Sequence, residues 1–548
     1  MTRDGGAKGS LAPRLTGWKV VWLVVAVLIL VEVPLAPAAI THGSPAPLIG
    51  LPVESIIVLA LLVLLPWRVA RVVVAVGFGV LVVVALALAA IDSGYRTVLD
   101  IHFDPLDWQQ LGDAYGVVRG SIGGPAASAL LALLVLVAVG LIVALSWAAL
   151  RAAGALRPRV RGTAVLSAVA AAWITAALVG AHIVAGQPTA AAASFGSISA
   201  STREAAEGIA AVAELSQQIT TDPYRDVPGS ELLTALRGKD VVFAFVESYG
   251  RVAVEDPEIS AGVRRVLRDG EEQLRADGYA SRSAFLTSPT FGGLSWLAHS
   301  TLQTGLWIDR QPLYSKLIRS DRFTLSDAFG AAGWRTVSVI PSNTDPWPFG
   351  TSFYHWDTQL NAHNMGYRGP SFGYARIPDQ YTWKHFADTE LARDDQPVMA
   401  EIDLVSSHTP WAPLPKLVPW SEIGDGSVFD PQPEQGPSAT EVWRDPDRVR
   451  QAYGQSVEYS LGAMFDFLHQ ADDPNLVIVV LGDHQPATIV SGQGAGHDVP
   501  ISIIAKDPAV LAAIDGWRWQ DGMLPSPNAP AWPMNDFRDR FLAAFSDR

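Results

Sequence analysis

The sequence predicts an α-helical transmembrane bundle of five spans, followed by an α/β domain with a mostly parallel central sheet. Three observations support this prediction. Five apolar segments of membrane-spanning length lie before residue 187. Two uninterrupted apolar runs, 241–246 and 476–481, have the length and composition of buried strands. Strand-like and helix-like stretches then alternate towards the C-terminus, which is the order expected of an α/β fold.

The five apolar segments each approach the ~20 residues that a helix needs to cross a hydrocarbon core of ~30 Å. A cleaved signal peptide is a poor interpretation of the first segment, because four further spans follow it and no clear small-residue cleavage site closes it. The predicted spans are Trp18–Ala39, Pro47–Trp67, Ala70–Ile91, Ala126–Leu150 and Thr163–Ala185.

Basic residues near the spans predict the orientation, because cytoplasmic loops carry an excess of lysine and arginine. Three basic sets fall on one side, and the loop at 92–113 on the other side is acidic. A multi-pass protein of a bacterial-type plasma membrane is expected, with the N-terminus cytoplasmic and the C-terminal domain extracytoplasmic. The basic residues are Arg3, Lys8, Arg14, Lys19, Arg68, Arg71, Arg151, Arg157, Arg159 and Arg161; the acidic ones are Asp92, Asp100, Asp104, Asp107 and Asp113.

The charge of the two regions differs. Residues 1–186 hold 12 Lys+Arg and 8 Asp+Glu, a balance of +4, whereas residues 187–548 hold 28 and 46, a balance of −18. An acidic domain without a basic stripe argues against nucleic acid as a partner. The chain has no cysteine, which excludes disulfides, thiolate metal sites and a cysteine nucleophile.

The chain is expected to divide into a transmembrane domain (1–186), a linker with a juxtamembrane helix (187–239, the helix over 205–219) and a catalytic domain (240–548). Within the last, periodicity predicts the elements in order. Strands are expected at 240–246, 333–340, 398–405, 476–481 and 499–505, helices at 259–278, 294–302 and 451–470, and a long loop at 409–442.

Acidic residues follow two of the predicted strands. Glu247 ends the strand at 240–246, and Asp483 and His484 follow the strand at 476–481, with Gly482 between them and the strand. Ligands gather where parallel strands end. Carboxylate and imidazole groups there suit a divalent cation that activates a hydroxyl and neutralises phosphate, although a loop residue and a capping turn are the simpler interpretations.

A hydroxyl that could react lies in the segment Ser288-Pro289-Thr290-Phe291-Gly292-Gly293-Leu294-Ser295. We expect Thr290 to be the nucleophile, since backbone N–H groups at a helix start favour anionic oxygens and metal coordination lowers a hydroxyl's pKa. Spacing does not separate Thr290 from Ser288. The alternative is that Thr287, Ser288, Thr290 and Ser295 are turn and capping residues.

Two further histidines are placed at predicted strand ends. His408 follows the strand at 398–405, and His497 precedes the strand at 499–505. Imidazoles near a metal can hold a phosphoryl oxygen or protonate a leaving alkoxide. Hydrogen-bonded loop residues are the alternative interpretation for both.

These residues, in this order behind apolar spans, resemble the lipoteichoic acid synthase and phosphoglycerol transferase branch of the alkaline phosphatase and sulfatase superfamily. The resemblance is carried by Val-Glu-Ser-Tyr at 246–249, Ser-Pro-Thr at 288–290, Ser-Ser-His-Thr-Pro at 406–410 and Gly-Asp-His-Gln-Pro at 482–486. It implies an alkaline phosphatase-like α/β domain. It also implies that Glu247, Thr290, Asp483 and His484 bind a catalytic metal, manganese in most of that branch, with zinc or magnesium as alternatives.

The resemblance further implies that Thr290 is the covalent nucleophile and that His408, Trp347 and His497 contact the substrate. Phosphoglycerol would pass from phosphatidylglycerol, through phosphothreonine, to a cell-envelope glycolipid or glycan. The segment 340–349 departs from the family pattern, since it keeps Trp347 but holds no basic residue. The alternatives are a phosphoethanolamine transferase, which Asp345 facing an ammonium would favour, a phosphodiesterase or sulfatase-like hydrolase, and a non-catalytic membrane sensor or scaffold.

Overall fold

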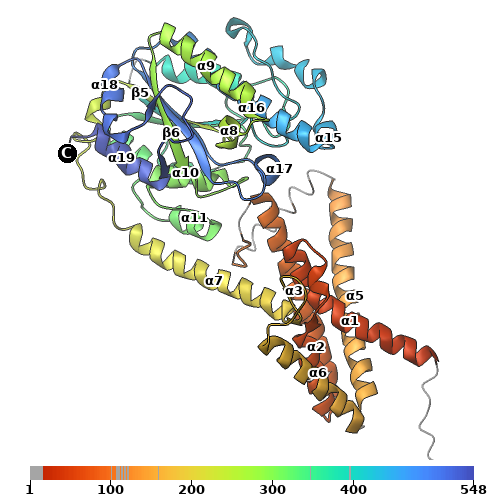
Figure 1. Cartoon of the computed structure of the whole chain (residues 1–548). Coiled ribbons are helices and arrows are strands. Elements are labelled where there is room, and N and C mark those ends of the chain that lie inside the picture. The colour runs from red at the N-terminus through yellow and green to blue at the C-terminus, as the bar shows by residue number, and fades with distance from the viewer. Residues whose placement is uncertain are drawn as a thin grey trace, which may run out of the picture. The chain divides into compact units, whose positions relative to one another are not determined.

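The computed structural model describes residues 17–99, 102–106, 112, 115, 119, 123–157, 160–345, 347–393 and 396–547. The chain forms two compact units: a helical unit of Met1–Arg96 with His102–Gly208, and an α/β unit of Thr97–Ile101 with Ile209–Arg548. Figure 1 shows both units. Several charged residues used to predict orientation lie outside the described residues, namely Arg3, Lys8, Arg14, Arg159, Asp100, Asp107 and Asp113, and only the backbone is described for Arg161.

Three helices of the described residues, not five, are long and apolar enough to cross a membrane. They are α1 (Gly17–His42), α3 (Arg68–Leu99) and α5 (Gly124–Leu156). The spans predicted at 47–67 and 163–185 are shorter helices, α2 (Val53–Leu64) and α6 (Val160–Leu178). Pro52 precedes α2 and Pro66 follows its last turn, and proline disfavours helix in the residue before it. The last seven residues of the fifth predicted span, 179–185, lie beyond α6 and include the short strand β2 (His182–Val184).

The segment predicted as a linker is largely ordered. It contributes the short strands β3 (Gln187–Pro188) and β4 (Ala190–Ala191), of which β4 pairs with β1 (Leu51–Pro52). The helix α7 begins at Ala193, ahead of the predicted start at 205, and runs to Gln218. Alanine is the strongest helix former, so a stretch of small residues continues a helix as readily as it forms a linker.

A nine-stranded sheet, in the order β12-β6-β11-β10-β5-β9-β7-β8 with β13 paired to β6, forms the centre of the α/β unit. Its strands are β5 (Asp240–Val246), β6 (Ala280–Thr287), β7 (Arg335–Ile340), β8 (Thr358–Asn361), β9 (Val398–Leu404), β10 (Leu476–Gly482), β11 (Asp498–Ala505), β12 (Gln520–Asp521) and β13 (Ala531–Pro533). All five strands predicted from periodicity are present.

The strands β10, β5, β9, β7 and β8 run parallel, as predicted. The strand β11 departs from the parallel order, because it pairs antiparallel with β10 and with β6. The connection from β10 to β11, residues 483–497, contains only the short helix α17 (Thr488–Ser491), whereas parallel neighbours are usually joined by a long crossover helix. The strand β6 was not predicted, since Ser281 and Ser283 interrupt its apolar pattern.

Helices cover both faces of the sheet (Figure 1). One face packs against α9 (Ser260–Ala276), α14 (Asp379–Phe386) and α16 (Pro446–Ala471). The other packs against α10 (Ser295–Thr304), α12 (Leu325–Ala332) and α19 (Asn535–Phe545). The predicted helices at 259–278, 294–302 and 451–470 correspond to α9, α10 and α16.

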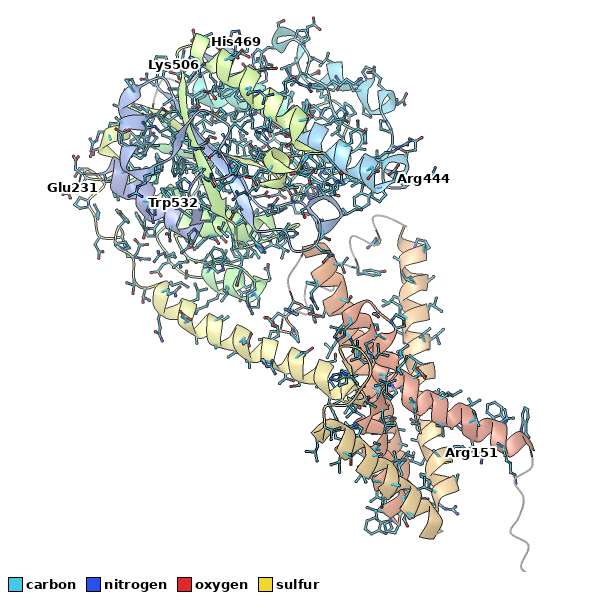
Figure 2. The ribbon with its side chains drawn as sticks, in the orientation of Figure 1. Arg151, Glu231, Arg444, His469, Lys506 and Trp532 are labelled. Atoms are coloured by element: carbon cyan, nitrogen blue, oxygen red, sulfur yellow. The ribbon has the colours of Figure 1, made fainter. Side chains whose placement is uncertain are left out.

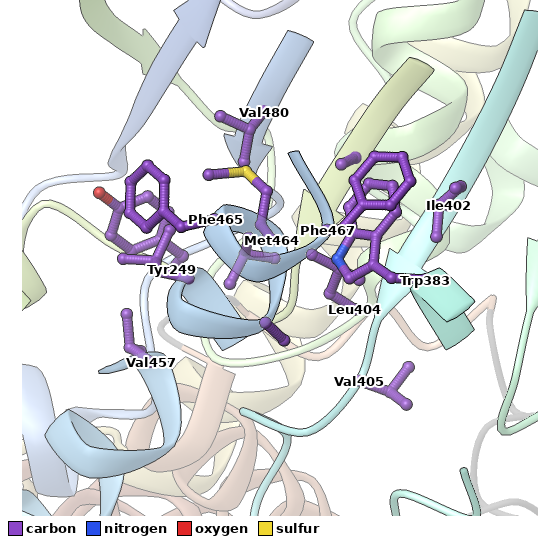
Figure 3. Close-up of a cluster of buried hydrophobic side chains, with 14 of the residues drawn as sticks. Tyr249, Trp383, Ile402, Leu404, Val405, Val457, Met464, Phe465, Phe467 and Val480 are labelled. Carbon is purple, nitrogen blue, oxygen red and sulfur yellow. The ribbon is translucent and has the colours of Figure 1, made fainter. Parts of the chain in front are cut away.

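The two faces have separate hydrophobic cores, because side chains alternate along each strand. Figure 3 shows part of the first core, where Trp383 of α14 stacks on Phe467 of α16 with ring centroids 4.3 Å apart. On the second face, Phe243 and Phe245 of β5 point towards α10 and α19. Charged side chains such as Glu231 and Arg444 lie at the periphery of the α/β unit, where they are exposed (Figure 2). The face that carries Phe243 and Phe245 also carries the site described next.

Candidate active site

The ends of the neighbouring strands β5 and β10 place three predicted metal ligands together. Val246 pairs with Gly482, so Glu247 and Asp483 follow at the same edge of the sheet. Ligand atoms of Glu247, Asp483 and His484 all lie within 4.8 Å of one another. The Nε2 of His484 lies 3.4 Å from Oε1 of Glu247 and 3.3 Å from Oδ2 of Asp483.

Tight turns hold these side chains in place. A Cβ added at Gly482 would lie 1.9 Å from the carbonyl oxygen of Tyr249, so this position requires glycine. The backbone N–H groups of Ser248 and His484 both donate to Oδ1 of Asp483, each at 2.7 Å. The orientation of the Asp483 carboxylate is therefore fixed by the backbone that follows each strand.

The hydrogen bonds of His484 decide which ring nitrogen faces the cluster. Its Nδ1 lies 2.8 Å from the carbonyl oxygen of Gln485, which only accepts, so Nδ1 carries the proton. The lone pair of Nε2 consequently points at Glu247 and Asp483. Oδ2 of Asp483 is buried and makes no hydrogen bond within the described part of the chain.

Burial and neighbouring charges shift the pKa values of both carboxylates. Burial raises the pKa of Asp483 to about 6, and the charge of Glu247 acts in the same direction. For Glu247, burial is outweighed by the charges of His408 and His484, and its pKa falls to about 2. Two carboxylates and an imidazole lone pair, with one buried carboxylate oxygen lacking a donor, fit a divalent cation.

Three hydroxyl groups of the segment 288–295 have different hydrogen-bond partners. Thr290 is buried, and its hydroxyl donates to the carbonyl oxygen of Gly293 rather than to the cluster. The hydroxyl of Ser288 donates to the carbonyl oxygen of Asp483 at 2.6 Å. In contrast, Oγ of Ser295 lies 3.1 Å from Oε2 of Glu247 and 3.2 Å from Nε2 of His484. Ser295 therefore occupies the position beside the ligands that was predicted for Thr290.

The turn before α10 explains this placement. Gly292, Gly293 and Leu294 all have positive φ, of 68°, 158° and 64°. This turn directs Thr290 away from the cluster and places Ser295 as the first residue of α10. The sequence analysis had considered Ser295 only as a turn or capping residue, although the Gly292-Gly293 pair directly before a helix was a visible signal of a phosphate-binding helix start.

A cavity of about 270 Å³ opens beside Ser295. Two of the predicted substrate contacts, Trp347 and His408, line it, whereas Thr290 and His497 do not. His408 stacks on Tyr374 with ring centroids 3.6 Å apart, and its Nδ1 lies 2.6 Å from the carbonyl oxygen of Thr409. The Nδ1 of His497 lies 3.2 Å from the carbonyl oxygen of Ser288, behind the turn.

A second cluster of titratable residues, which the sequence analysis missed, also lines the cavity. Nδ1 of His299 lies 2.9 Å from Oε1 of Glu401 and 3.6 Å from Oδ1 of Asp403. Burial would lower the pKa of His299, but Asp403 and Glu401 outweigh burial and raise it to about 9. The signal was available: two acidic residues alternate within the predicted strand at 398–405, where a buried strand should be apolar.

The segment 340–349 contributes Ile340, Ser342, Asn343 and Trp347 to the cavity. Asp345, which would favour an ammonium headgroup if it faced the site, is exposed and does not line the cavity.

A divalent metal titration tests the proposed ligands. Asp483→Asn keeps the oxygen that accepts from Ser248 and His484 but replaces the unbonded Oδ2 with a donor. We expect the affinity for Mn²⁺, measured by isothermal titration calorimetry on the full chain, to fall by at least about tenfold. The exposed Glu434→Gln is the matched control and should bind like the wild type. Equal affinity in both variants would remove Asp483 from the ligand set.

Comparison with known proteins gives resemblances of fold at low sequence identity. No model of a protein family and no curated protein matches the chain. Among solved structures, the integral membrane protein lipooligosaccharide phosphoethanolamine transferase A of Neisseria meningitidis is 12% identical, with 96% of this chain and 95% of that chain covered and a TM-score of 0.47. A phosphoglycerol transferase of Streptococcus pyogenes, solved with sn-glycerol-1-phosphate, is 14% identical over 62% of this chain and 91% of that chain, with a TM-score of 0.34.

A lipoteichoic acid synthase of Listeria monocytogenes is 12% identical over 54% of this chain and 71% of that chain, with a TM-score of 0.34. Similarity at this level does not establish an activity, and the proposal below depends on the site itself.

Proposed function

We propose that the protein is a membrane-bound, metal-dependent phosphotransferase of the alkaline phosphatase and sulfatase type, with Ser295 as its nucleophile. The observation that carries the proposal is the position of the Ser295 hydroxyl, 3.1 Å from Glu247 and 3.2 Å from His484, beside a cavity. An apolar N-terminal region would hold this site at the membrane surface, close to a lipid substrate. The α/β unit would lie on the outer face, as the basic residues near the helices predict.

The ligand set would be Glu247, Asp483 and His484, with the oxygen of Ser295 completing it in place of Thr290. A divalent cation bound there would lower the pKa of the Ser295 hydroxyl and offset negative charge on the phosphoryl oxygens. Manganese is the expected metal from the family resemblance, with zinc and magnesium as alternatives.

The first step is a displacement at phosphorus. The oxygen of Ser295 bonds to the phosphorus of a phospholipid headgroup, the bond from phosphorus to the diacylglycerol oxygen breaks, and the serine proton ends on that oxygen. Ser295 begins α10, so the backbone N–H groups of Ser295 and Trp296, which precede the first bonded N–H of the helix at Leu297, would stabilise the phosphoryl oxygens. Diacylglycerol leaves, and the headgroup phosphate stays on Ser295.

The second step removes the headgroup phosphate from Ser295 and regenerates the free enzyme. A hydroxyl of a cell-envelope glycolipid or glycan bonds to phosphorus, the Ser295 oxygen leaves, and the acceptor's proton returns to it. His408 would transfer a proton or hold phosphate; this role is supported by its position in the cavity lining and by the contact of its Nδ1 with the Thr409 carbonyl, which leaves Nε2 for the substrate. The loop that carries His408 is joined to the metal site, since Ser407 Oγ donates to the Glu247 carbonyl at 2.6 Å.

Peptide mass spectrometry tests the proposal. The full chain is incubated with Mn²⁺ and vesicles containing phosphatidylglycerol, phosphatidylethanolamine and phosphatidylcholine, and the peptide covering 285–302 is sequenced by fragmentation. We expect a headgroup-phosphate adduct on Ser295 and release of diacylglycerol. Diacylglycerol without transfer to an added glycolipid would indicate a phosphodiesterase. Neither adduct nor diacylglycerol would contradict the proposal and favour the sensor or scaffold alternative.

A further inference from the structure

The cavity beside Ser295 has an unusual lining for a site that receives an anionic phosphate. Among the described residues, no lysine or arginine lines it. Its wall is instead built from aromatic rings and carboxylates. The aromatic residues are Phe245, Trp296, Tyr314, Trp347, Tyr354, Trp356 and Tyr374, and the carboxylates are Glu247, Glu401, Asp403 and Asp483.

The charges around His299 do not balance after a metal is bound. One divalent cation would offset Glu247 and Asp483, and the second imidazole of the lining, His408, acts on Glu247. Glu401 and Asp403 then face the single imidazole of His299, which supplies at most one positive charge. Both oxygens of Glu401 are engaged, by His299 at 2.9 Å and by the Gln303 amide at 2.5 Å. Asp403 contacts His299 only at 3.6 Å, so its carboxylate remains available to a substrate cation.

The position of Asp403 relative to the phosphate site follows from the sheet register. Asp403 pairs with Phe245 on the neighbouring strand β5, and Glu247 lies two residues further along the same face. Two residues of a strand span about 7 Å. His299 lies four residues after Ser295 on α10, one helical turn deeper on the same side of the helix. Glu401, Asp403 and His299 therefore lie at least one residue pair further from the strand ends than Glu247, where the reaction at phosphorus would take place.

We propose that Asp403, oriented beside His299 and Glu401 and surrounded by the aromatic lining, binds the ammonium group of a phosphoethanolamine or phosphocholine headgroup. This inference rests on the proposed function and names its substrate class. Two carbons separate nitrogen from the phosphate ester oxygen in both headgroups, so the ammonium reaches only groups near the phosphate, and Asp403 lies on the strand next to Glu247. Aromatic faces and a carboxylate attract an ammonium, and they offer a glycerol headgroup no comparable interaction. The expected donor therefore changes from phosphatidylglycerol to an amine-bearing phospholipid.

Binding of the free headgroup esters separates this inference from the catalytic proposal. Quenching of tryptophan fluorescence is measured on the full Mn²⁺-loaded chain as phosphoethanolamine, phosphocholine or glycerol 3-phosphate is added. We expect at least one amine-bearing ester to bind at least about tenfold more tightly than glycerol 3-phosphate. Asp403→Asn should remove this preference, and the exposed Glu434→Gln should retain it. The test requires no turnover, so it remains decisive even if no lipid donor forms an adduct on Ser295.

Three results would overturn the inference. Glycerol 3-phosphate could bind as tightly as both amine-bearing esters, or the preference for an amine could survive in Asp403→Asn. A metal titration could also show two Mn²⁺ ions per chain with one lost in Asp403→Asn. That last result would assign His299, Glu401 and Asp403 to a second metal rather than to a headgroup.

Discussion

Ser295→Ala is expected to lower turnover of a phospholipid donor by at least about 10³-fold, because no other oxygen lies beside both Glu247 and His484 among the described hydroxyl groups of the turn. The variant lacks only an oxygen from a half-buried side chain, so the fold should be retained. The measurement is the rate of diacylglycerol release by the full chain in detergent, together with the mass of the 285–302 peptide. No adduct should form in this variant.

Two neighbouring hydroxyl groups supply matched controls. Ser288→Ala removes a donor to the Asp483 carbonyl, and Thr290→Ala removes a donor to the Gly293 carbonyl. The Ser288 hydroxyl also accepts from the Thr290 N–H at 3.3 Å, so Ser288→Ala loses two structural hydrogen bonds and Thr290→Ala loses one. Each variant should still form the adduct on Ser295. If Thr290→Ala abolished the adduct while Ser295→Ala kept it, the nucleophile would be Thr290, as the family resemblance implied.

Asp222→Ala is expected to lower the free energy of unfolding of the α/β unit by about 3–5 kcal/mol, since it leaves the buried guanidinium group of Arg322 without a paired carboxylate and leaves Arg538 only its contact with Asp539. Oδ2 of Asp222 lies 2.7 Å from Nη2 of Arg538 and 3.1 Å from Nη2 of Arg322, and all three side chains are almost fully buried. Burial and the charge of Arg538 lower the pKa of Arg322 to about 10. Removing the Asp222 carboxylate leaves only Asp539 to offset the repulsion between the two arginines.

The same arginines bind backbone carbonyls of separate elements, which explains why the effect should spread through the unit. Arg322 donates to the carbonyls of Thr304, at the end of α10, and of Gln218, at the end of α7. Unfolding of the full chain in detergent, followed by near-ultraviolet circular dichroism, gives the measurement. Asp321→Ala is the control, because its pair with Arg225 is exposed and should contribute less than about 1 kcal/mol. Equal effects in the two variants would contradict this account.

The strand ends show what could be predicted about the site. An apolar strand followed by an acidic residue is a local pattern, and parallel strands bring their carboxyl ends to one edge whatever lies between them. Glu247, Asp483 and His484 were therefore found from sequence, although 236 positions separate Glu247 from Asp483. The register between β5 and β10 then places their ligand atoms within reach of one metal.

The number of membrane helices was predicted less accurately than the metal ligands. Apolar content alone does not show where a helix begins or ends. Pro52 and Pro66 flank α2, and Gly180 follows the end of α6, inside two of the predicted spans. The direction of β11 could not be predicted for a related reason. Strand pattern identifies a strand but not its partner, and the sequence between β10 and β11 does not show that it lacks a long crossover helix.

Residue pattern alone predicts that this chain joins an apolar helical region to an α/β unit with a carboxylate and imidazole site at its strand ends. These features depend on local periodicity and on residue type. The hydroxyl that faces this site, and the groups that line the cavity beside it, are known only from the folded structure. Three successive residues with positive φ direct Thr290 away from the metal ligands and bring Ser295 beside them. The register of β5 and β9 pairs Asp403 with Phe245, two residues before Glu247, and His299 lies one helical turn after Ser295 on α10. Backbone conformation and strand register set these positions, and neither can be read from residue spacing.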